Sequence, residues 1–179
     1  MMNKLVFLII VVLFLLMMFF NKKVCLIQLF IRQIKVLKND HTKKISIWDL
    51  MCFIVFPIAI SALIVFGLHY QIDKDLANTL TTVFSLVFTI LFGFAAVIME
   101  RSASENTKRK QVISETFISI VTSTVLSLFA AVISIILTKI NNELMASILS
   151  FAVLILSLII FMLLLMITKR TFVIYCDNE

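Results

Sequence analysis

The most regular chemical pattern in the chain is formed by small and hydroxyl-bearing residues, which follow one helical face in each of two apolar segments. The first stripe, at spacings of three and four, consists of Asn78, Thr82, Ser85, Thr89, Gly93, Ala96 and Glu100. The second stripe, at the same spacings, consists of Thr116, Ser119, Ser123, Ser127, Ala130, Ser134 and Thr138. Small faces allow helix backbones to approach closely, and hydroxyls can bond across such an interface. We expect the two stripes to pack against each other within one chain; in the alternatives, one stripe faces a partner chain or lines a narrow hydroxylated pore.

Ionisable groups, which carry proton, ion or nucleophilic chemistry inside membranes, are missing from the interiors of the apolar segments. Asp49, Glu100 and Glu115 sit only at the ends of these segments. The three cysteines share no metal-ligand spacing with each other or with the two histidines. The pattern therefore predicts a protein that is not an enzyme and that has no catalytic residues, metal or cofactor.

The composition places these stripes in a membrane protein. Of 179 residues, 62% are hydrophobic and 15% are charged, whereas a soluble domain is about half apolar and about a quarter charged. A chain of this length could not bury such an apolar excess, which excludes a soluble enzyme. With only 2 Gly and 1 Pro, the chain also lacks the turns of a β-barrel. The predicted fold class is all-α, a polytopic transmembrane helical bundle.

Five apolar runs are long enough, or nearly so, to cross a bilayer, which takes about 20 residues. Four of them form the expected core: 47–70, 79–99, 116–138 and 144–168. The run 5–20 is expected to be a retained N-terminal anchor, because no small residues offer a cleavage site and Asn21-Lys22-Lys23 follows it. The expected organisation is an anchor with an amphipathic helix (1–46), a four-span bundle (47–170) and a short cytoplasmic tail (171–179).

Basic residues lie almost entirely on one side of this predicted bundle. Crossing five times puts the segment 21–46, the segment 100–115 and the residues that follow the last run, beginning with Lys169 and Arg170, on the same side. Together they hold every Lys and Arg except Lys4, Lys74 and Lys139. Positive charge marks the cytoplasmic side of a membrane protein. We therefore expect the N-terminus outside, the C-terminus inside and the net charge of +6 on the cytoplasmic face.

Residues 24–38 have the pattern of a basic amphipathic helix that follows the first span. Its polar side consists of Gln28, Arg32, Lys35 and Asn39, and its apolar side of Leu26, Ile27, Phe30, Ile31, Ile34 and Leu37. Helices of this kind lie in the membrane interface, which is the interpretation that we favour. The alternative is a cytoplasmic docking surface for sister subunits or for a soluble partner.

The basic inner face is the surface through which we expect a soluble cytoplasmic effector protein to bind. The expected contact residues are Arg32, Lys35, Lys38, Arg101, Lys108, Arg109 and Lys110. The same charges also serve as a topology signal, and they could attract anionic lipid or nucleic acid. Nucleic acid is expected at most through the partner protein.

The order of parts in the last four spans is itself informative. Ser46-Ile47-Trp48-Asp49 opens a span that contains Pro57, the segment 82–93 reads TVFSLVFTILFG, and a basic loop at 100–115 lies between two short outer hairpins. Over roughly residues 45–170, this arrangement resembles small inner-membrane proteins of bacterial phage-defence systems. These are the KwaA family of Kiwa membrane subunits and, more distantly, the RexB family of phage-exclusion proteins.

The two resemblances imply different functions. The first implies a homo-oligomeric sensor or scaffold in the bacterial inner membrane that recruits a soluble effector. The second implies a small ion channel that depolarises the cell, with Thr82, Ser85, Thr89, Ser123 and Ser127 near the conduction path. The one-sided charge and the short outer loops favour the scaffold, and an accessory subunit of a larger membrane complex is a third possibility.

Overall fold

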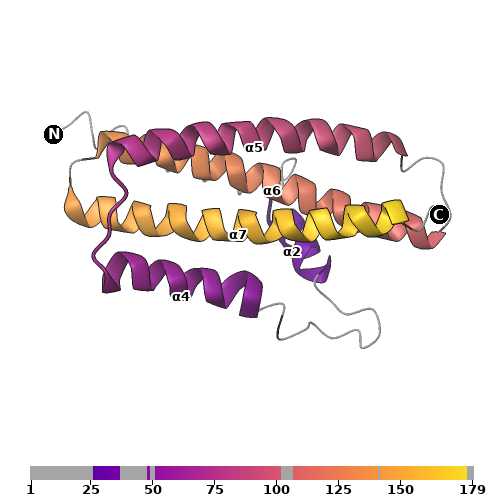
Figure 1. Cartoon of the computed structure of the whole chain (residues 1–179), viewed down its shortest axis with the longest axis horizontal. Helices are drawn as coiled ribbons and strands as arrows, with labels where there is room; N and C mark the ends of the chain where they lie inside the picture. Colours follow the sequence, from indigo (N-terminus) through magenta and orange to yellow (C-terminus); the bar gives the residue numbers. More distant parts are fainter. Residues whose placement is uncertain (1–25, 37–47, 49–50, 102–106, 141, 177–179) are drawn as a thin grey trace.

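A computed structural model describes residues 26–36, 48, 51–101, 107–140 and 142–176, and all of its elements in these ranges are helices (Figure 1). They are α2 (Leu26–Val36), α4 (Phe56–Ala62), α5 (Lys74–Arg101), α6 (Thr107–Lys139) and α7 (Glu143–Cys176). Two π-helical turns, η1 (Met51–Val55) and η2 (Leu63–Gly67), continue α4 at either end. The predicted N-terminal anchor at 5–20 and the basic residue Lys38 lie outside the described residues.

Within the described ranges, three helices are long and apolar enough to cross a membrane: Lys74–Met99, Gln111–Lys139 and Glu143–Phe172. They correspond to three of the four predicted core spans, and each extends beyond its predicted run. The helix α6 has 33 residues, about 50 Å at 1.5 Å per residue, which exceeds a hydrocarbon core of about 30 Å. The chain is therefore a membrane protein with transmembrane helices.

The fourth predicted core span, 47–70, is not confirmed as a crossing, because the apolar helix described there, Met51–Gly67, has 17 residues. Pro57, which cannot donate a backbone hydrogen bond, lies inside this helix, in the first turn of α4 and directly after the wide turn η1. At its C-terminal end, His69 adopts a left-handed conformation with φ of 51°, so the helix cannot continue past it.

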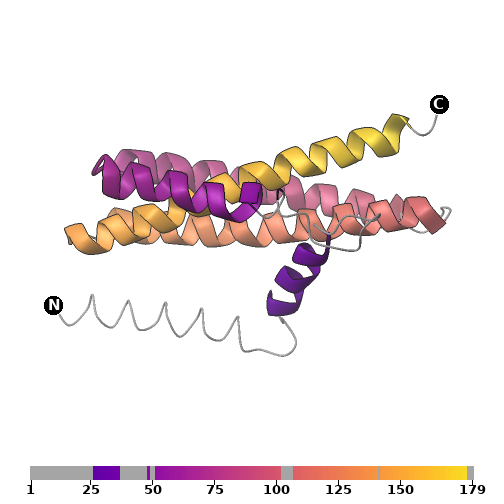
Figure 2. The ribbon, with the colours of Figure 1, turned by 90° about the horizontal axis from the view of Figure 1, so that it is seen from below.

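The helix α6 lies at the centre of the bundle, with α5 and α7 packed on different sides of it (Figures 1 and 2). In the most apolar stretch of each helix, 61% of α6 is buried, against 17% of α5 and 22% of α7. The short helix α4 packs on α7, and α2 packs on α6. Much of the outer surface of α4, α5 and α7 is therefore open to lipid or to other chains.

A seven-residue repeat on α5 forms its contact with the bundle. Ala77, Phe84, Leu91 and Ile98 are all buried, and residues seven apart lie on one helical face. Ala77 and Phe84 belong to a cluster with residues of α6 and α7, such as Leu126 and Val153. The other two members, Leu91 and Ile98, share a second cluster with residues of the same two helices: Ile113, Ile120 and Ile167.

Side-chain caps start the two helices that follow the short hairpins. The backbone N–H of Leu76 donates to Asp73 Oδ1 at 2.8 Å, and the N–H of Leu144 donates to Asn142 Oδ1 at 3.1 Å. These bonds satisfy backbone donors that the first helical turn leaves unpaired. The segment before α5 is also tied to α7, because the N–H of Ile72 donates to Ser150 Oγ at 3.1 Å. The segment that leads into α5 is thereby fixed to α7 at this end of the bundle, which we call the hairpin end. The opposite end, where α5 ends and α6 begins, we call the basic end.

Candidate functional site

The small-residue stripe of α6 lies inside the bundle. Five of its hydroxyl residues are fully buried: Thr116, Ser119, Ser123, Ser127 and Ser134. Most of these hydroxyls donate to carbonyls of their own helix, as Ser123 Oγ does to the Ser119 carbonyl at 2.9 Å. The exception is Ser134 Oγ, which has no hydrogen-bond partner among the described residues. Within one chain, this stripe provides a close-packed surface and not an open conduit.

The small-residue stripe of α5 has the opposite environment. Thr82, Ser85, Thr89 and Gly93 are all exposed, so the expectation that the two stripes pack against each other is wrong. The physical reason is that α5 turns its larger residues, including Phe84 and Leu91, toward the bundle, where they bury more apolar area than small residues would. A side chain added at Gly93 would meet nothing within 4 Å.

The exposed α5 stripe lies among large apolar residues on the same outer surface. Leu86, Ile90 and Phe92 are each more than half exposed. The hydroxyls of Thr82, Ser85 and Thr89 donate to carbonyls one turn earlier in α5, at 3.1, 2.8 and 2.9 Å. Since these hydroxyl protons are already hydrogen-bonded within α5, this surface can contact lipid or another helix without leaving a donor unpaired.

A polar cluster joins three helices part-way along the bundle. Arg170 Nη1 on α7 lies 3.3 Å from Glu115 Oε2 on α6, and Gln111 Nε2 donates to Glu115 Oε1 at 3.1 Å. The same arginine donates through Nη2 to the Val36 carbonyl, in the last turn of α2, at 3.3 Å. In the sequence alone, Arg170 is recognisable only as a charge that signals topology, and Glu115 only as the end of a span. The one local signal was the spacing of four between Gln111 and Glu115, which puts them on one face of a helix.

The predicted basic contact residues fall into two groups. Arg101 is the last residue of α5, and Lys108, Arg109 and Lys110 lie in the first turn of α6, so this group gathers at the basic end (Figure 1). By contrast, Arg32 and Lys35 are exposed on α2, which lies against the side of the bundle (Figure 2). The structure therefore does not bring all the predicted contact residues into one surface.

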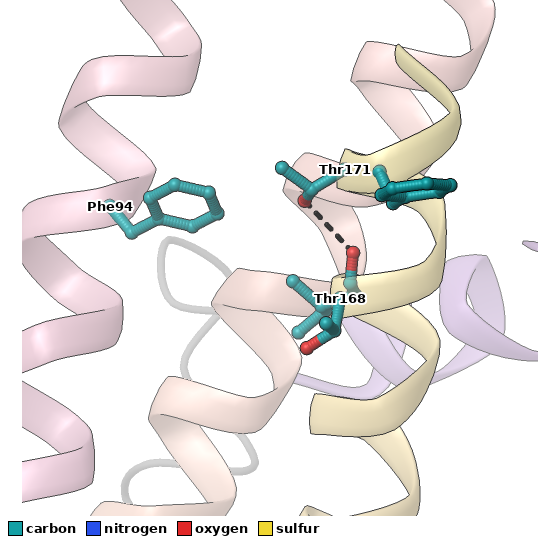
Figure 3. A pocket seen from close by; sticks show the side chains of 5 residues that line it. Phe94, Thr168 and Thr171 are labelled. Carbon is teal, nitrogen blue, oxygen red and sulfur yellow. Dashed lines mark hydrogen bonds between the residues drawn. The ribbon is translucent and has the colours of Figure 1, made fainter. Parts of the chain in front are cut away.

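A groove of about 410 Å³ opens between α5 and α7 near the basic end, lined by Phe94, Ile167, Thr168, Thr171 and Phe172. Figure 3 shows Phe94 of α5 facing the two threonines of α7. Both hydroxyls donate within α7, Thr168 to Leu164 and Thr171 to Ile167, each at 2.9 Å. The groove thus offers an apolar surface without a free hydroxyl donor for a polar ligand.

Within the described part of the chain, no group of three or more His, Cys, Asp and Glu side chains is placed to hold a metal ion. Comparison of the chain with protein-family models, with curated proteins and with solved structures finds no match.

Proposed function

We propose that the chain is a non-enzymatic scaffold or sensor of the bacterial inner membrane, that it forms homo-oligomers through the outer face of α5, and that it recruits a soluble cytoplasmic effector at its basic end. The observation that carries the proposal is the contrast between the two stripes. The two small-residue stripes have nearly the same spacing. The stripe of α6 is buried inside the bundle, whereas the stripe of α5 stays exposed.

The uncovered α5 stripe suits a helix–helix contact between copies of the chain. In a bilayer, lipid tails are as apolar as side chains, so helices associate through close packing of small residues. Gly93 and Ser85 lie eight residues apart on this stripe, and neither is covered within the chain. A second copy that approaches here would pack its backbone closely along α5.

The basic end suits a cytoplasmic contact. Arg101, Lys108, Arg109 and Lys110 lie on either side of the short connection between α5 and α6. Positive charge in short loops favours the cytoplasmic side, and it attracts an acidic protein surface at long range. In this orientation, the extra turns of α6 beyond the membrane present the cluster to a soluble partner.

A role in phage defence is part of the proposal, and its support is the resemblance of residues 45–170 to the KwaA and RexB families. The test is to purify the full chain from its native host in mild detergent, to measure the mass of the complex and to identify bound proteins. We expect a homo-oligomer with a cytoplasmic partner, and deletion of the gene should raise phage plating. A monomer without a partner would contradict the scaffold function.

A depolarising channel is the second candidate, favoured by the exposure of Thr82, Ser85 and Thr89 on α5. Their oxygens could line a path between several copies of α5, whereas Ser123 and Ser127 are enclosed by packing within one chain. Reconstituted liposomes would then pass ions, and Ser85→Leu would block them. Liposomes that stay impermeable would contradict the channel and leave the scaffold standing.

A further inference from the structure

The surface of α2 consists of three faces with different environments. Toward the bundle it buries Leu26, Gln33 and Val36. A second ridge, formed by Ile27, Ile31 and Ile34, is 39–51% exposed. The structure therefore corrects the two-sided pattern expected from the sequence, in which all the apolar residues shared one side.

A third ridge of α2 is polar and basic. Gln28, Arg32 and Lys35 are all exposed, and they repeat at spacings of four and three, as the isoleucines do. At about 100° per residue, the basic ridge lies about 100° around the helix from the isoleucine ridge. Two adjoining faces of α2, one apolar and one cationic, are thus left uncovered by the described part of the chain.

The distribution of polar and apolar residues around α2 is unlike that of a helix on the surface of a soluble protein. A polar residue, Gln33, is buried against the bundle, and its side-chain nitrogen and oxygen have no hydrogen-bond partner among the described residues. Three isoleucines meanwhile point away from the bundle. A helix that packed on a soluble core would show the reverse pattern, so the medium around α2 must accept apolar side chains.

The polar cluster fixes the depth of α2. Arg170 holds the Val36 carbonyl of α2 at the level of Glu115 on α6. From this level to the hairpin end, α6 runs from Glu115 to Lys139, a length of about 36 Å at 1.5 Å per residue. The hydrocarbon core is about 30 Å thick, and the headgroup layers bring the bilayer to about 40–45 Å. When the hairpin end sits at one membrane surface, the C-terminal end of α2 therefore lies among the headgroups of the other leaflet.

We propose that α2 is a binding site for anionic phospholipid: Ile27, Ile31 and Ile34 enter the acyl chains, and Arg32 and Lys35 contact the phosphates of the headgroups. The charge complementarity follows from the two cations and from the absence of any acidic residue in α2. A helix with adjoining apolar and basic faces binds at the membrane interface, and its binding strengthens with anionic lipid content. This inference does not depend on the proposed scaffold function, and it takes Arg32 and Lys35 out of the surface for the cytoplasmic effector.

The test uses the full chain in vesicles, with Ile31→Trp introduced into a Trp48→Phe background, because Trp48 is the only tryptophan. Phospholipids with brominated acyl chains quench a tryptophan that reaches the hydrocarbon. We expect brominated anionic vesicles to lower the emission of the introduced tryptophan by about twofold, and brominated zwitterionic vesicles to lower it less. The double change Arg32→Glu with Lys35→Glu should abolish the difference between the two lipids.

Two controls separate lipid binding from a change in the fold. Phe161→Trp, on the exposed face of α7 and in the same Trp48→Phe background, should be quenched equally by both lipids. Lys139→Glu, at the hairpin end, should leave the response of the tryptophan on α2 unchanged.

Three results would overturn the inference. In the first, the tryptophan on α2 is unquenched in every vesicle and open to aqueous iodide. In the second, anionic and zwitterionic lipids quench it equally. In the third, it is shielded only when a cytosolic protein extract is added, which would assign the surface to a protein partner.

Discussion

The guanidinium of Arg170 lies 3.3 Å from the carboxylate of Glu115 and also donates to the carbonyl of Val36. One side chain therefore links the last long helix, the central helix and the short helix α2. Arg170 and Glu115 are 21% and 25% exposed, so their attraction is only partly screened by solvent. The link is the one described place where α2 is held by a side chain with two separate partners.

Arg170→Met should release α2 while the three long helices stay assembled. The change removes both the ion pair and the bond to Val36, and we expect a loss of about 1–2 kcal/mol in the free energy of unfolding. Amide hydrogen exchange in α2 should accelerate more than exchange in α6. Lys169→Met is the matched control, because it removes the neighbouring, exposed cation and should leave α2 protected. Equal exchange in both variants would show that Arg170 does not hold α2.

Ser123→Leu should destabilise the bundle, because Ser123 is fully buried and its hydroxyl bonds to its own helix. Adding bulk to a close-packed interface costs about 1–3 kcal/mol. Ser123→Ala keeps the small volume and should cost less than about 1 kcal/mol, since the lost hydrogen bond lies within α6. Thermal unfolding in detergent measures both. A Leu variant as stable as the Ala variant would mean that α6 is not closely packed there.

Gly93→Leu should leave the folded chain intact and weaken its self-association. The new side chain meets nothing within 4 Å in one chain, but it would keep a second α5 at a distance. We expect the dissociation constant of the oligomer to rise by about tenfold or more, a change of about 1.4 kcal/mol. Ala59→Leu, which adds similar bulk to the exposed face of α4, should have little effect. Fluorescence energy transfer between labelled copies in vesicles measures both; equal transfer in the two variants would exclude α5 as the interface.

Reversing the charges of Lys108, Arg109 and Lys110 should weaken recruitment of the cytoplasmic partner. These residues begin α6 at the basic end, and rim charges of this kind act mainly on the rate of association and on its salt dependence. We expect the association rate to fall by about tenfold at low salt, with a smaller difference at high salt. Lys139→Glu, at the other end of α6, is the control. Recruitment at an unchanged rate would remove this cluster from the interface.

Three of the transmembrane helices could be predicted from the sequence because hydrocarbon thickness imposes a minimum length of apolar run. Their ends could not be predicted as well. The apolar run ends at the membrane surface, whereas the helix continues through charged residues, as α6 does between Thr107 and Gln111. The run 47–70 is not confirmed as a crossing: its residues are apolar, but the apolar helix described there covers Met51–Gly67, and the left-handed His69 follows its C-terminal end.

The environment of the two small-residue stripes could not be predicted from the stripes themselves. Their spacings are almost the same, yet Ser123 is buried and Ser85 is exposed. The signal that distinguishes the two stripes is a repeat of larger apolar residues at every seventh position of α5, including Phe84 and Leu91. Because this repeat faces the bundle, the small-residue stripe of α5 faces outward. Contacts such as the one between Arg170 and Val36, 134 residues apart, leave no local pattern in a single sequence.

The packing of α4 on α7 has a consequence for synthesis of the chain. The ribosome makes α4 before α5 and α6, but the described helix on which α4 packs is α7, which follows both of them in the chain. During translation, the helix on which α4 packs is therefore still missing while two longer helices enter the bilayer. Until α7 is made, α4 must stay in lipid or be bound by the insertion machinery. The central helix α6 likewise stays half covered until α7 arrives. Assembly of the described bundle can thus be completed only after α7 has been made, and a nascent chain truncated before α7 would present α4 and one side of α6 to quality-control proteases.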